Sequence, residues 1–363
     1  MLHKINLPDC TAHLNWVVRL QCNLLHALCD PDLAPADVTA DWAIALRPDV
    51  DGDWIRRLCR WSKTKKSMLA RMKAVAGLAV DEKQAVITHY EANMQFPDSF
   101  DDAKEAPPAT TPLPNGLSAD AEAAYRDYFL MFYDPIFYGQ KGYPIDDPNL
   151  NGKWFTKDSY LESYHAANPA IKVCPLCDGT MDGAEVDHWL AKNRHFPELN
   201  CHPQNLVEIC GACNGRTNKG EKLALDTGTM DPFKNWFHPY MRPAAGGVTV
   251  EVVDRRPKLS GNDDDTERRI ENLDGLINLS ERWAQKFDNL TSRIEERIRH
   301  HRRRKRIFDK DSLLDQIQSW LIDAQSEIGL GEYKLLESTL LTEASDSTSD
   351  MFVELLVYAT EAP

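Results

Sequence analysis

Hydrophobic residues in the first 95 positions recur at the spacing of an α-helix. Leucines and valines return every three or four residues over 14–28, and the stretches 52–75 and 82–94 behave similarly. This period gathers apolar side chains on one helix face, so we expect a helical N-terminal domain over residues 1–95. Residues 96–117 are rich in proline and acidic residues and are expected to form a linker.

Two more helices are expected over residues 118–170. Ser118 fits a helix N-cap, followed by an acidic first turn and by seven aromatic residues between Tyr125 and Tyr138. Aromatics this closely spaced are more typical of a buried core than of a surface that stacks on bases. The stretch "KDSYLESYHAAN" predicts a second, shorter helix that completes this helical lead-in.

The pattern changes after residue 222. Alternating residues in "GGVTVEVVDRRPKLSG" predict a small hairpin within a connector, residues 223–261. From Asp263 a helical period returns, and one apolar stripe from Ile270 to Ile298 predicts a long helix in a C-terminal helical domain, residues 262–363. The expected fold is mostly α and multidomain, with one small mixed module embedded at residues 171–222, here called the cysteine module.

Composition narrows the class of protein. The chain has 363 residues, enough for two or three domains, and 42% are hydrophobic. No apolar run approaches the ~20 residues that span a bilayer, and the N-terminus lacks the pattern of a secretory signal, so we expect a cytoplasmic protein with no membrane partner. Nine cysteines, four of them in two CxxC pairs, favour metal-bound thiolates over a disulfide framework.

Charge is distributed unevenly along the chain. The formal net charge is −14, yet residues 55–73 carry eight Lys or Arg and no acid. Residues 293–306 carry eight basic residues against two glutamates, whereas residues 307–363 carry twelve acids against two lysines. The net charge therefore does not exclude a basic surface that binds nucleic acid or another acidic partner.

The two CxxC pairs predict a metal site. Cys174 and Cys177 form one knuckle, and Cys210 and Cys213 form the other. Four thiolates in a tetrahedral arrangement suit Zn²⁺, and because four protein ligands leave no open position, this zinc is expected to be structural. The 32 residues between the knuckles exceed the spacing of a simple zinc ribbon, so a folded segment is expected between them.

That segment carries polar residues in a strand–strand–helix pattern. A strand through "GAEVDHWL" would place Asp187 and His188 on opposite faces, and "HPQNLVEI" would return with Asn205. A helix from the second knuckle would place Asn214 and Asn218 on one face, four residues apart. Carboxylate and amide oxygens suit Mg²⁺ or Mn²⁺, and a neutral histidine can take a proton from water, which is the equipment for phosphodiester hydrolysis.

With these residues, positions 173–222 resemble the HNH endonucleases of the zinc-knuckle ββα-metal type. The resemblance implies that His188 is the general base and that Asp187 and Asn214 hold the catalytic ion. It implies that Asn205 orients the base and its loop, and that Asn218 is an additional ligand. Asparagine rather than histidine at the third motif position favours Mg²⁺ or Mn²⁺ as the catalytic ion.

Several basic residues are candidates for binding nucleic acid. Lys192, Arg194 and His195 follow the expected base and could contact a phosphate backbone, although solvated loop charges are an equally good interpretation. The resemblance places a phosphate-contacting lysine at Lys219. The second basic run adds Arg302, Arg303 and Arg304, again with a solvated helix face as the alternative.

The cysteine module is especially similar to HNH nucleases that accompany ATPases in bacterial anti-phage defence, of the Septu and retron-associated types. The sequence contains no P-loop motif, so the ATPase would be a separate partner chain. DNA is the favoured substrate, and the amphipathic C-terminal helix could supply a homodimer. The alternatives are a stand-alone restriction or mobile-element nuclease, and a non-catalytic zinc-stabilised DNA-binding subunit.

Overall fold

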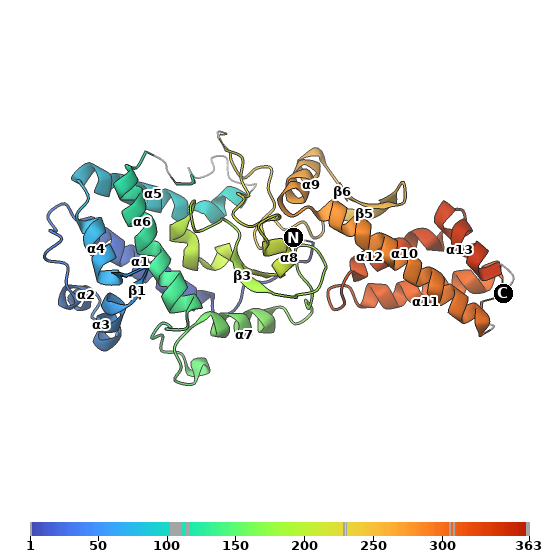
Figure 1. Ribbon diagram of the computed structural model, residues 1–363, viewed down its shortest axis with the longest axis horizontal. Coiled ribbons are helices and arrows are strands. Elements are labelled where there is room, and N and C mark those ends of the chain that lie inside the picture. Colours follow the sequence, from blue (N-terminus) through green and yellow to red (C-terminus); the bar gives the residue numbers. More distant parts are fainter. Residues whose placement is uncertain are drawn as a thin grey trace.

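The computed structural model describes residues 2–101, 110–113, 116–227, 229, 231–304, 306–307 and 309–360. Thirteen α-helices and three two-stranded sheets lie in this part of the chain, so the expected mostly helical fold is confirmed. The molecule is elongated, with the N-terminal helices at one end, the cysteine module in the middle and the C-terminal helices at the other end (Figure 1). No helix among the described residues is both long and apolar enough to cross a membrane.

The N-terminal region is helical, as its apolar period predicts. Its helices are α1 Thr11–Leu28, α2 Ala40–Leu46, α3 Gly52–Arg60, α4 Met68–Ala76 and α5 Val80–Met94. The stretch 52–75 is not one helix, because the short strands β1 Ser62–Lys63 and β2 Lys66–Ser67 separate α3 from α4. Thr64 and Lys65 adopt positive φ in the tight turn between these strands.

The described part of the expected linker is packed against the rest of the protein. Phe96 and Phe100 in the short 3₁₀ helix η1, Phe96–Phe100, are buried, and Phe100 contacts the rings of Phe233 and His238. Leu113 is buried too. Residues 102–109 and 114–115 of this stretch lie outside the described residues.

The aromatic helix packs into the core, as its residue spacing predicts. Ser118 caps α6 Ala119–Met131, which continues into a π-helical segment, η2 Phe132–Tyr138. Six of the seven aromatics are buried and only Tyr138 is exposed. The π-helical segment includes Pro135, which has no N–H to give to a regular α-helical ladder. These aromatics line one side of the cysteine module, so they can position its side chains.

The middle of the molecule holds the expected strand–strand–helix arrangement. Its elements are η3 Pro148–Leu150, α7 Lys157–Ala167, β3 Glu185–His188, η4 Pro197–Cys201, η5 Pro203–Asn205, β4 Leu206–Ile209 and α8 Gly211–Asn214. Strands β3 and β4 pair antiparallel, with Asp187 opposite Val207 and His188 opposite Leu206. The N-terminus lies beside this module rather than at the end of the molecule (Figure 1), with His3 N bonded to Pro175 O at 3.3 Å.

The C-terminal region begins with the expected hairpin and continues as helices. Its elements are β5 Val248–Val253, β6 Arg256–Gly261, α9 Asp264–Ile277, α10 Leu279–Arg303, α11 Lys310–Ser326, α12 Lys334–Ser345 and α13 Asp350–Thr360. The prediction of one long helix is wrong, because Asn278 adopts a left-handed conformation with φ 52° and separates α9 from α10. The apolar stripe is nevertheless buried along both helices.

Candidate functional site

The four knuckle cysteines converge on one point in the core. Cys174 and Cys213 have their sulfurs 3.9 Å apart, and the sulfurs of Cys177 and Cys210 are 3.8 Å apart. All four sulfurs lie within 4.8 Å of one another, and all four residues are buried. These separations are far too long for a disulfide bond and match the roughly 3.8 Å edge of a tetrahedron with metal–sulfur bonds of about 2.3 Å. This sulfur centre can therefore hold a metal ion such as zinc.

Backbone groups from both knuckles support the sulfur centre. Cys210 N donates to Cys174 Sγ at 3.5 Å, and Cys213 N donates to Cys210 Sγ at 3.4 Å. In the first knuckle, Cys174 N bonds to Gly179 O at 2.8 Å, which closes the loop. Hydrogen bonds from the neighbouring thiols, first from Cys174, lower the pKa of Cys210, whereas burial raises the pKa of Cys174.

The pairing of β3 with β4 places two of the predicted site residues on opposite faces of one strand. Val186 and His188 point into the core, whereas Glu185 is exposed and Asp187 is half-buried on the other face. His188 is the last residue of β3, where the strand leaves the sheet. The alternation predicted from the sequence is therefore confirmed in this strand.

The ring of His188 is held in a defined orientation. Its Nε2 is 2.9 Å from the backbone oxygen of Asn200, and the ring packs edge-on against Tyr133 at a centroid distance of 4.5 Å. A carbonyl oxygen only accepts hydrogen bonds, so Nε2 carries the proton and Nδ1 of the neutral ring keeps its lone pair. Burial, and then the positive charge of Lys192, lower the pKa of His188 well below its usual range. His188 is therefore a neutral imidazole whose Nδ1 lone pair faces the Lys192 ammonium.

The carbonyl that orients His188 belongs to a segment held by the N-terminal helices. Asn200 lies in η4, and its side-chain oxygen accepts from Gln21 of α1 at 3.0 Å while its side-chain nitrogen donates to Phe129 O. In the same segment, the buried Glu198 accepts a hydrogen bond from Asn93 of α5. Burial raises the pKa of Glu198 to about 7. The helical N-terminal region thus fixes the backbone to which the histidine is bonded.

Lys219 has a different environment from the surface lysine that the resemblance implies. Its side chain is fully buried, with Nζ 2.5 Å from His188 O and 2.6 Å from Asp187 Oδ2. A buried ammonium requires such partners, because removing it from water is otherwise strongly unfavourable. The expected phosphate contact by Lys219 is therefore corrected: this lysine ties Asp187 to the end of β3.

The helix after the second knuckle is shorter than predicted. α8 ends at Asn214, and Gly215 has extended backbone that turns the chain away. Asn218 therefore does not share a helix face with Asn214; its side-chain nitrogen donates to Ala212 O at 2.7 Å. The chain turns back here because Lys219 N bonds to Cys213 O at 3.1 Å and the lysine side chain is buried beneath β3.

Asn214 instead lies beside the outer face of β3. Its side-chain nitrogen is 3.2 Å from Glu185 Oε2. Glu185 and Asp187 are two residues apart on one strand face, and together with Asn214, which is bonded to Glu185, they are here called the oxygen edge. Two carboxylates and an amide are the ligand types that Mg²⁺ and Mn²⁺ prefer.

Asn205 joins the segments on both sides of the histidine. Its side-chain oxygen accepts from Leu190 N at 2.7 Å, and its side-chain nitrogen donates to Leu190 O and Leu199 O. Its backbone oxygen accepts from Trp189 N at 2.8 Å. This buried amide therefore fixes the loop that follows His188 against η4, the geometry that a loop-orienting asparagine requires.

Among the residues predicted to contact nucleic acid, Lys192 lies beside His188. Its Nζ is 3.5 Å from His188 Nδ1 and 4.0 Å from the centre of the Tyr133 ring. Burial lowers the pKa of Lys192 to about 8, although the charge of Asp187 opposes this shift. Because the ammonium lies on the lone-pair side of the imidazole, it can hold an anion next to the base.

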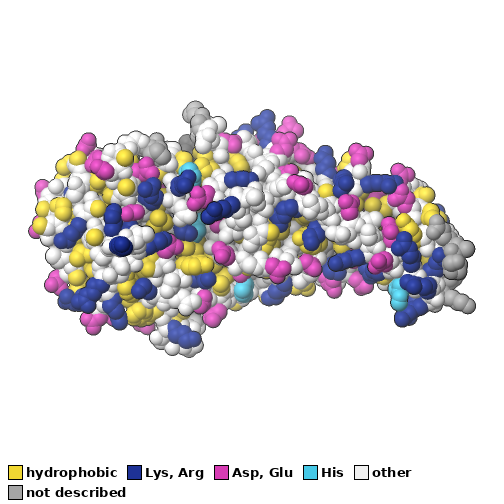
Figure 2. Space-filling model, viewed as in Figure 1, with side chains coloured by type: hydrophobic (Ala, Val, Ile, Leu, Met, Phe, Trp, Pro, Cys, Tyr) yellow, Lys and Arg dark blue, Asp and Glu magenta, His cyan; other side chains and the backbone are white. Residues whose placement is uncertain are grey.

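The other predicted nucleic-acid residues lie farther out. Arg194 is exposed, with Nε 3.6 Å from Glu221, and His195 is half-buried, with its backbone oxygen accepting from Leu113 N. Arg302–Arg304 lie at the end of α10, roughly 30 Å along the helix from Trp283 at 1.5 Å per residue. Figure 2 shows basic side chains and a histidine at this end of the molecule. The structure does not bring this cluster to the histidine.

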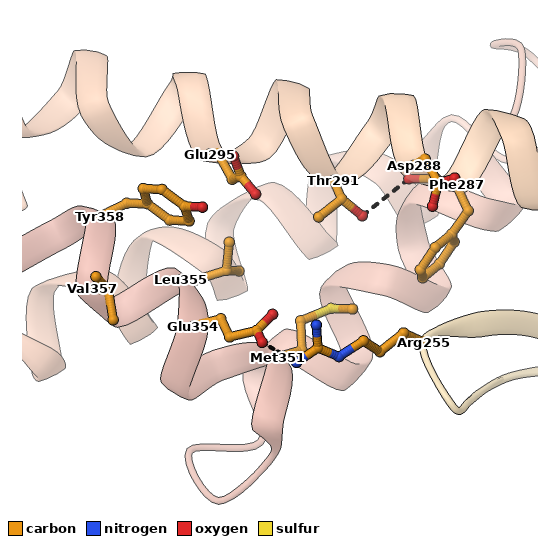
Figure 3. Close-up of a pocket in the computed structure, with 10 residues that line it drawn as sticks. All are labelled: Arg255, Phe287, Asp288, Thr291, Glu295, Met351, Glu354, Leu355, Val357 and Tyr358. Carbon is orange, nitrogen blue, oxygen red and sulfur yellow. Dashed lines mark hydrogen bonds and ion pairs between the residues drawn. The ribbon is translucent and has the colours of Figure 1, made fainter.

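A separate cavity of about 550 Å³ lies in the C-terminal region between α10 and α13 (Figure 3). Arg255 reaches into it from the turn between β5 and β6 and pairs with Glu354. Asp288 at its rim pairs with Arg256 at 3.2 Å. The cavity therefore has charged walls that already neutralise one another, and it is separate from both the sulfur centre and the oxygen edge.

No protein-family model, curated protein or solved structure matches this chain. The resemblance to HNH endonucleases therefore depends on the residues of the cysteine module alone.

Four residues of the site were not selected from the sequence. Glu185 had a usable signal, because a strand places it on the same face as Asp187. Asn200, Tyr133 and Arg282 had none, since they reach the site from other segments. Arg282 donates to two of the cysteine sulfurs from more than 60 residues away in the chain.

Proposed function

We propose that this protein is a metal-dependent endonuclease of the HNH type, which hydrolyses phosphodiester bonds of nucleic acid, with DNA as the favoured substrate. The observation that carries the proposal is the environment of His188. A buried neutral imidazole with a fixed tautomer lies at the end of β3, while two carboxylates and an amide lie on the other face of the same strand. This combination suits the activation of water next to a bound divalent ion.

His188 would act as the general base. Its Nε2 proton is bonded to Asn200 O, so the attacking water would lose its proton to Nδ1. The low pKa of His188 keeps the ring neutral through mildly acidic pH. Proton removal by a positioned base typically contributes about 10²–10⁴-fold to a rate.

Glu185, Asp187 and Asn214 would hold Mg²⁺ or Mn²⁺. Their oxygen atoms fit a hard cation, and Lys219 fixes the Asp187 carboxylate at the strand end. A divalent ion bound there supplies positive charge for the scissile phosphate and the leaving oxygen. The ion in the sulfur centre, by contrast, has four protein ligands and would be structural zinc.

Lys192 would hold the scissile phosphate beside the base. Its ammonium is close to His188 Nδ1, and a phosphate oxygen bonded to it would bring the phosphorus within reach of a water on the imidazole. Arg194 and His195 would contact the backbone next to the cleaved bond. Arg302–Arg304 would contact a more distant part of the same nucleic acid or an acidic partner.

The biological setting proposed from the resemblance is a bacterial anti-phage defence system in which a separate ATPase activates this nuclease in the cytoplasm. A homodimer would allow cleavage of both strands. The alternatives are a restriction or mobile-element nuclease that acts alone, and a zinc-stabilised DNA-binding subunit without activity.

The test is cleavage of supercoiled plasmid by purified protein with Mg²⁺ or Mn²⁺, with and without candidate ATPase partners. Wild type is expected to nick or linearise the plasmid, and His188→Ala is expected to be at least 100-fold slower. His26→Ala, which changes a partly exposed histidine of α1, is the matched control and should cut normally. Single-stranded DNA and RNA substrates in parallel decide the substrate class.

Two results would overturn parts of this proposal. An intact plasmid under every metal and partner tried would favour the non-catalytic subunit. Equal cleavage by wild type and His188→Ala would show that another residue is the base.

A further inference from the structure

The sulfur centre is in contact with the C-terminal helices through one arginine. Arg282, in the first turn of α10, donates from Nη1 to Cys213 Sγ and from Nη2 to Cys177 Sγ, both at 3.3 Å. One of these cysteines belongs to each knuckle. The planar guanidinium therefore spans one edge of the sulfur tetrahedron with two parallel hydrogen bonds.

The charges of the two groups are complementary. Four thiolates around one divalent ion leave two net negative charges, and Arg282 brings a positive charge to two of the four sulfurs. Hydrogen bonds to charged groups are stronger than hydrogen bonds between neutral groups. Groups just outside the ligands typically change metal affinity by about 10–100-fold.

Further contacts fix the same knuckle to the C-terminal region. Trp283 donates its indole N–H to Cys177 O at 2.9 Å. Before and within α12, Tyr333 N donates to Asp178 O at 2.6 Å and Leu335 N to the Asp178 carboxylate at 2.9 Å. Gly179 allows this approach, because a Cβ at that position would lie 2.7 Å from the Tyr333 hydroxyl oxygen.

These contacts depend on the conformation of the first knuckle. Cys177, Asp178 and Gly179 form the end of the loop that Cys174 and Cys177 close around the ion. Without the ion, only weak thiol and backbone hydrogen bonds hold the four cysteines together, so the backbone oxygens of Cys177 and Asp178 can move more easily. The hydrogen bonds to Trp283 and Tyr333 would then weaken together.

We propose that Arg282 is a functional part of the metal centre, and that through Arg282 and the first knuckle the attachment of the C-terminal helices α9 to α13 depends on the bound ion. The coupling is reciprocal: an ion that strengthens this attachment is itself held more tightly by the attached helices. The inference does not depend on nuclease activity.

The first test measures zinc release from the purified, zinc-loaded full chain to a chromogenic chelator. Arg282→Met keeps the aliphatic stem but removes the charge and the donors, and we expect zinc release about tenfold faster than wild type. Arg282→Lys keeps the charge and is expected to be intermediate. Arg293→Met, at an exposed arginine of the same helix, is the control and should release zinc at the wild-type rate.

The second test uses wild type alone, so that it stands even if Arg282→Met fails to fold. Hydrogen exchange by mass spectrometry is compared before and after chelation of zinc. We expect faster exchange in residues 172–180 and 333–336, while amides in the middle of α11 keep their protection. Zinc release from Arg282→Met at the wild-type rate, or unchanged exchange at 333–336 after chelation, would overturn the proposal.

Discussion

The sulfur centre and the oxygen edge lie in one small module, but they differ in how complete they are. The sulfur centre is fully buried, and four side chains of one type meet at tetrahedral distances. The oxygen edge is partly exposed, and one of its carboxylates is already paired with the buried ammonium of Lys219. A structural ion requires a closed set of ligands, whereas an ion that takes part in catalysis needs open positions for water and substrate.

This difference separates stability from the proposed activity. Loss of a sulfur ligand should remove folding free energy, because an ion binds its assembled site only in the folded chain. Loss of Glu185 or Asn214, which are at least partly exposed, should leave the fold and the zinc content intact while it reduces the proposed cleavage. Loss of Asp187 would also remove a partner of the buried Lys219 ammonium. The predictions below test this separation, starting with the largest effect.

Cys174→Ser should abolish tight zinc binding and unfold the cysteine module. Structural zinc sites contribute an apparent ~10–16 kcal/mol, comparable to the whole stability of a domain. Zinc content by atomic absorption and thermal unfolding by circular dichroism check this. Cys22→Ser, at a half-buried cysteine outside the centre, is the control. A fully folded, zinc-loaded Cys174→Ser protein would remove the structural role from this centre.

Glu198→Gln tests the buried polar segment behind His188. Burial raises the folded pKa of Glu198 from 4.5 to about 7, so its contribution to stability is present below pH ~4.5 and is lost as pH rises through 7. The variant does not ionise. Its stability relative to wild type should therefore increase by up to about 3 kcal/mol between pH 4.5 and pH 8.

Urea unfolding at both pH values measures this change for Glu198→Gln. Glu91→Gln, at an exposed carboxylate of α5, should show little change with pH. A difference between Glu198→Gln and wild type that is the same at both pH values would show that folding does not raise the pKa of Glu198.

Lys192→Met tests the smallest of the expected effects, the influence of the Lys192 charge on the proposed base His188. With a pKa of about 8, Lys192 is charged at neutral pH, so wild-type cleavage should decline above pH 8. The variant should be about tenfold slower at pH 7, the loss of roughly one charge-assisted hydrogen bond, and should lack that decline. Its acid limb should move to higher pH, because the lysine charge lowers the pKa of His188.

The pH–rate profile of plasmid cleavage measures both limbs. Lys157→Met is a matched control, because Lys157 also lies over a tyrosine ring, that of Tyr138, at 4.2 Å but is not at the histidine. If the pH–rate profile of Lys192→Met coincides with that of wild type, Lys192 has no role in cleavage and only packs against Tyr133.

The sequence predicted the parts of the site that depend on local spacing. The CxxC pairs predicted the sulfur centre, and strand alternation predicted the opposite faces of Asp187 and His188. Apolar periodicity also predicted most of the N-terminal helices, and alternation predicted the hairpin of β5 and β6. These features are encoded within a few neighbouring residues, so they can be inferred without tertiary contacts.

The parts that were not predicted arise from distant contacts or from single backbone conformations. Asn278 interrupts a continuous apolar stripe by one left-handed residue. No sequence pattern marks Lys219 as buried. Its ammonium is nevertheless buried, because it bonds to His188 O and to the Asp187 carboxylate on β3. Asn200 reaches His188 and Arg282 reaches the sulfur centre from other segments, and no local pattern marks either residue.

The contacts of Asp178 constrain the order in which the chain can fold. Its carboxylate accepts from His3, 175 residues earlier, and from the backbone of Leu335, 157 residues later. During synthesis from the N-terminus, both CxxC pairs leave the ribosome well before α10 and α12. Any closure of the first knuckle before then occurs without its C-terminal partners, and the ring of contacts around Asp178 is completed only after α12 has been synthesised. Such long-range contacts form slowly. A metal ion that binds early would therefore hold the first knuckle in its final conformation until the C-terminal helices pack against it.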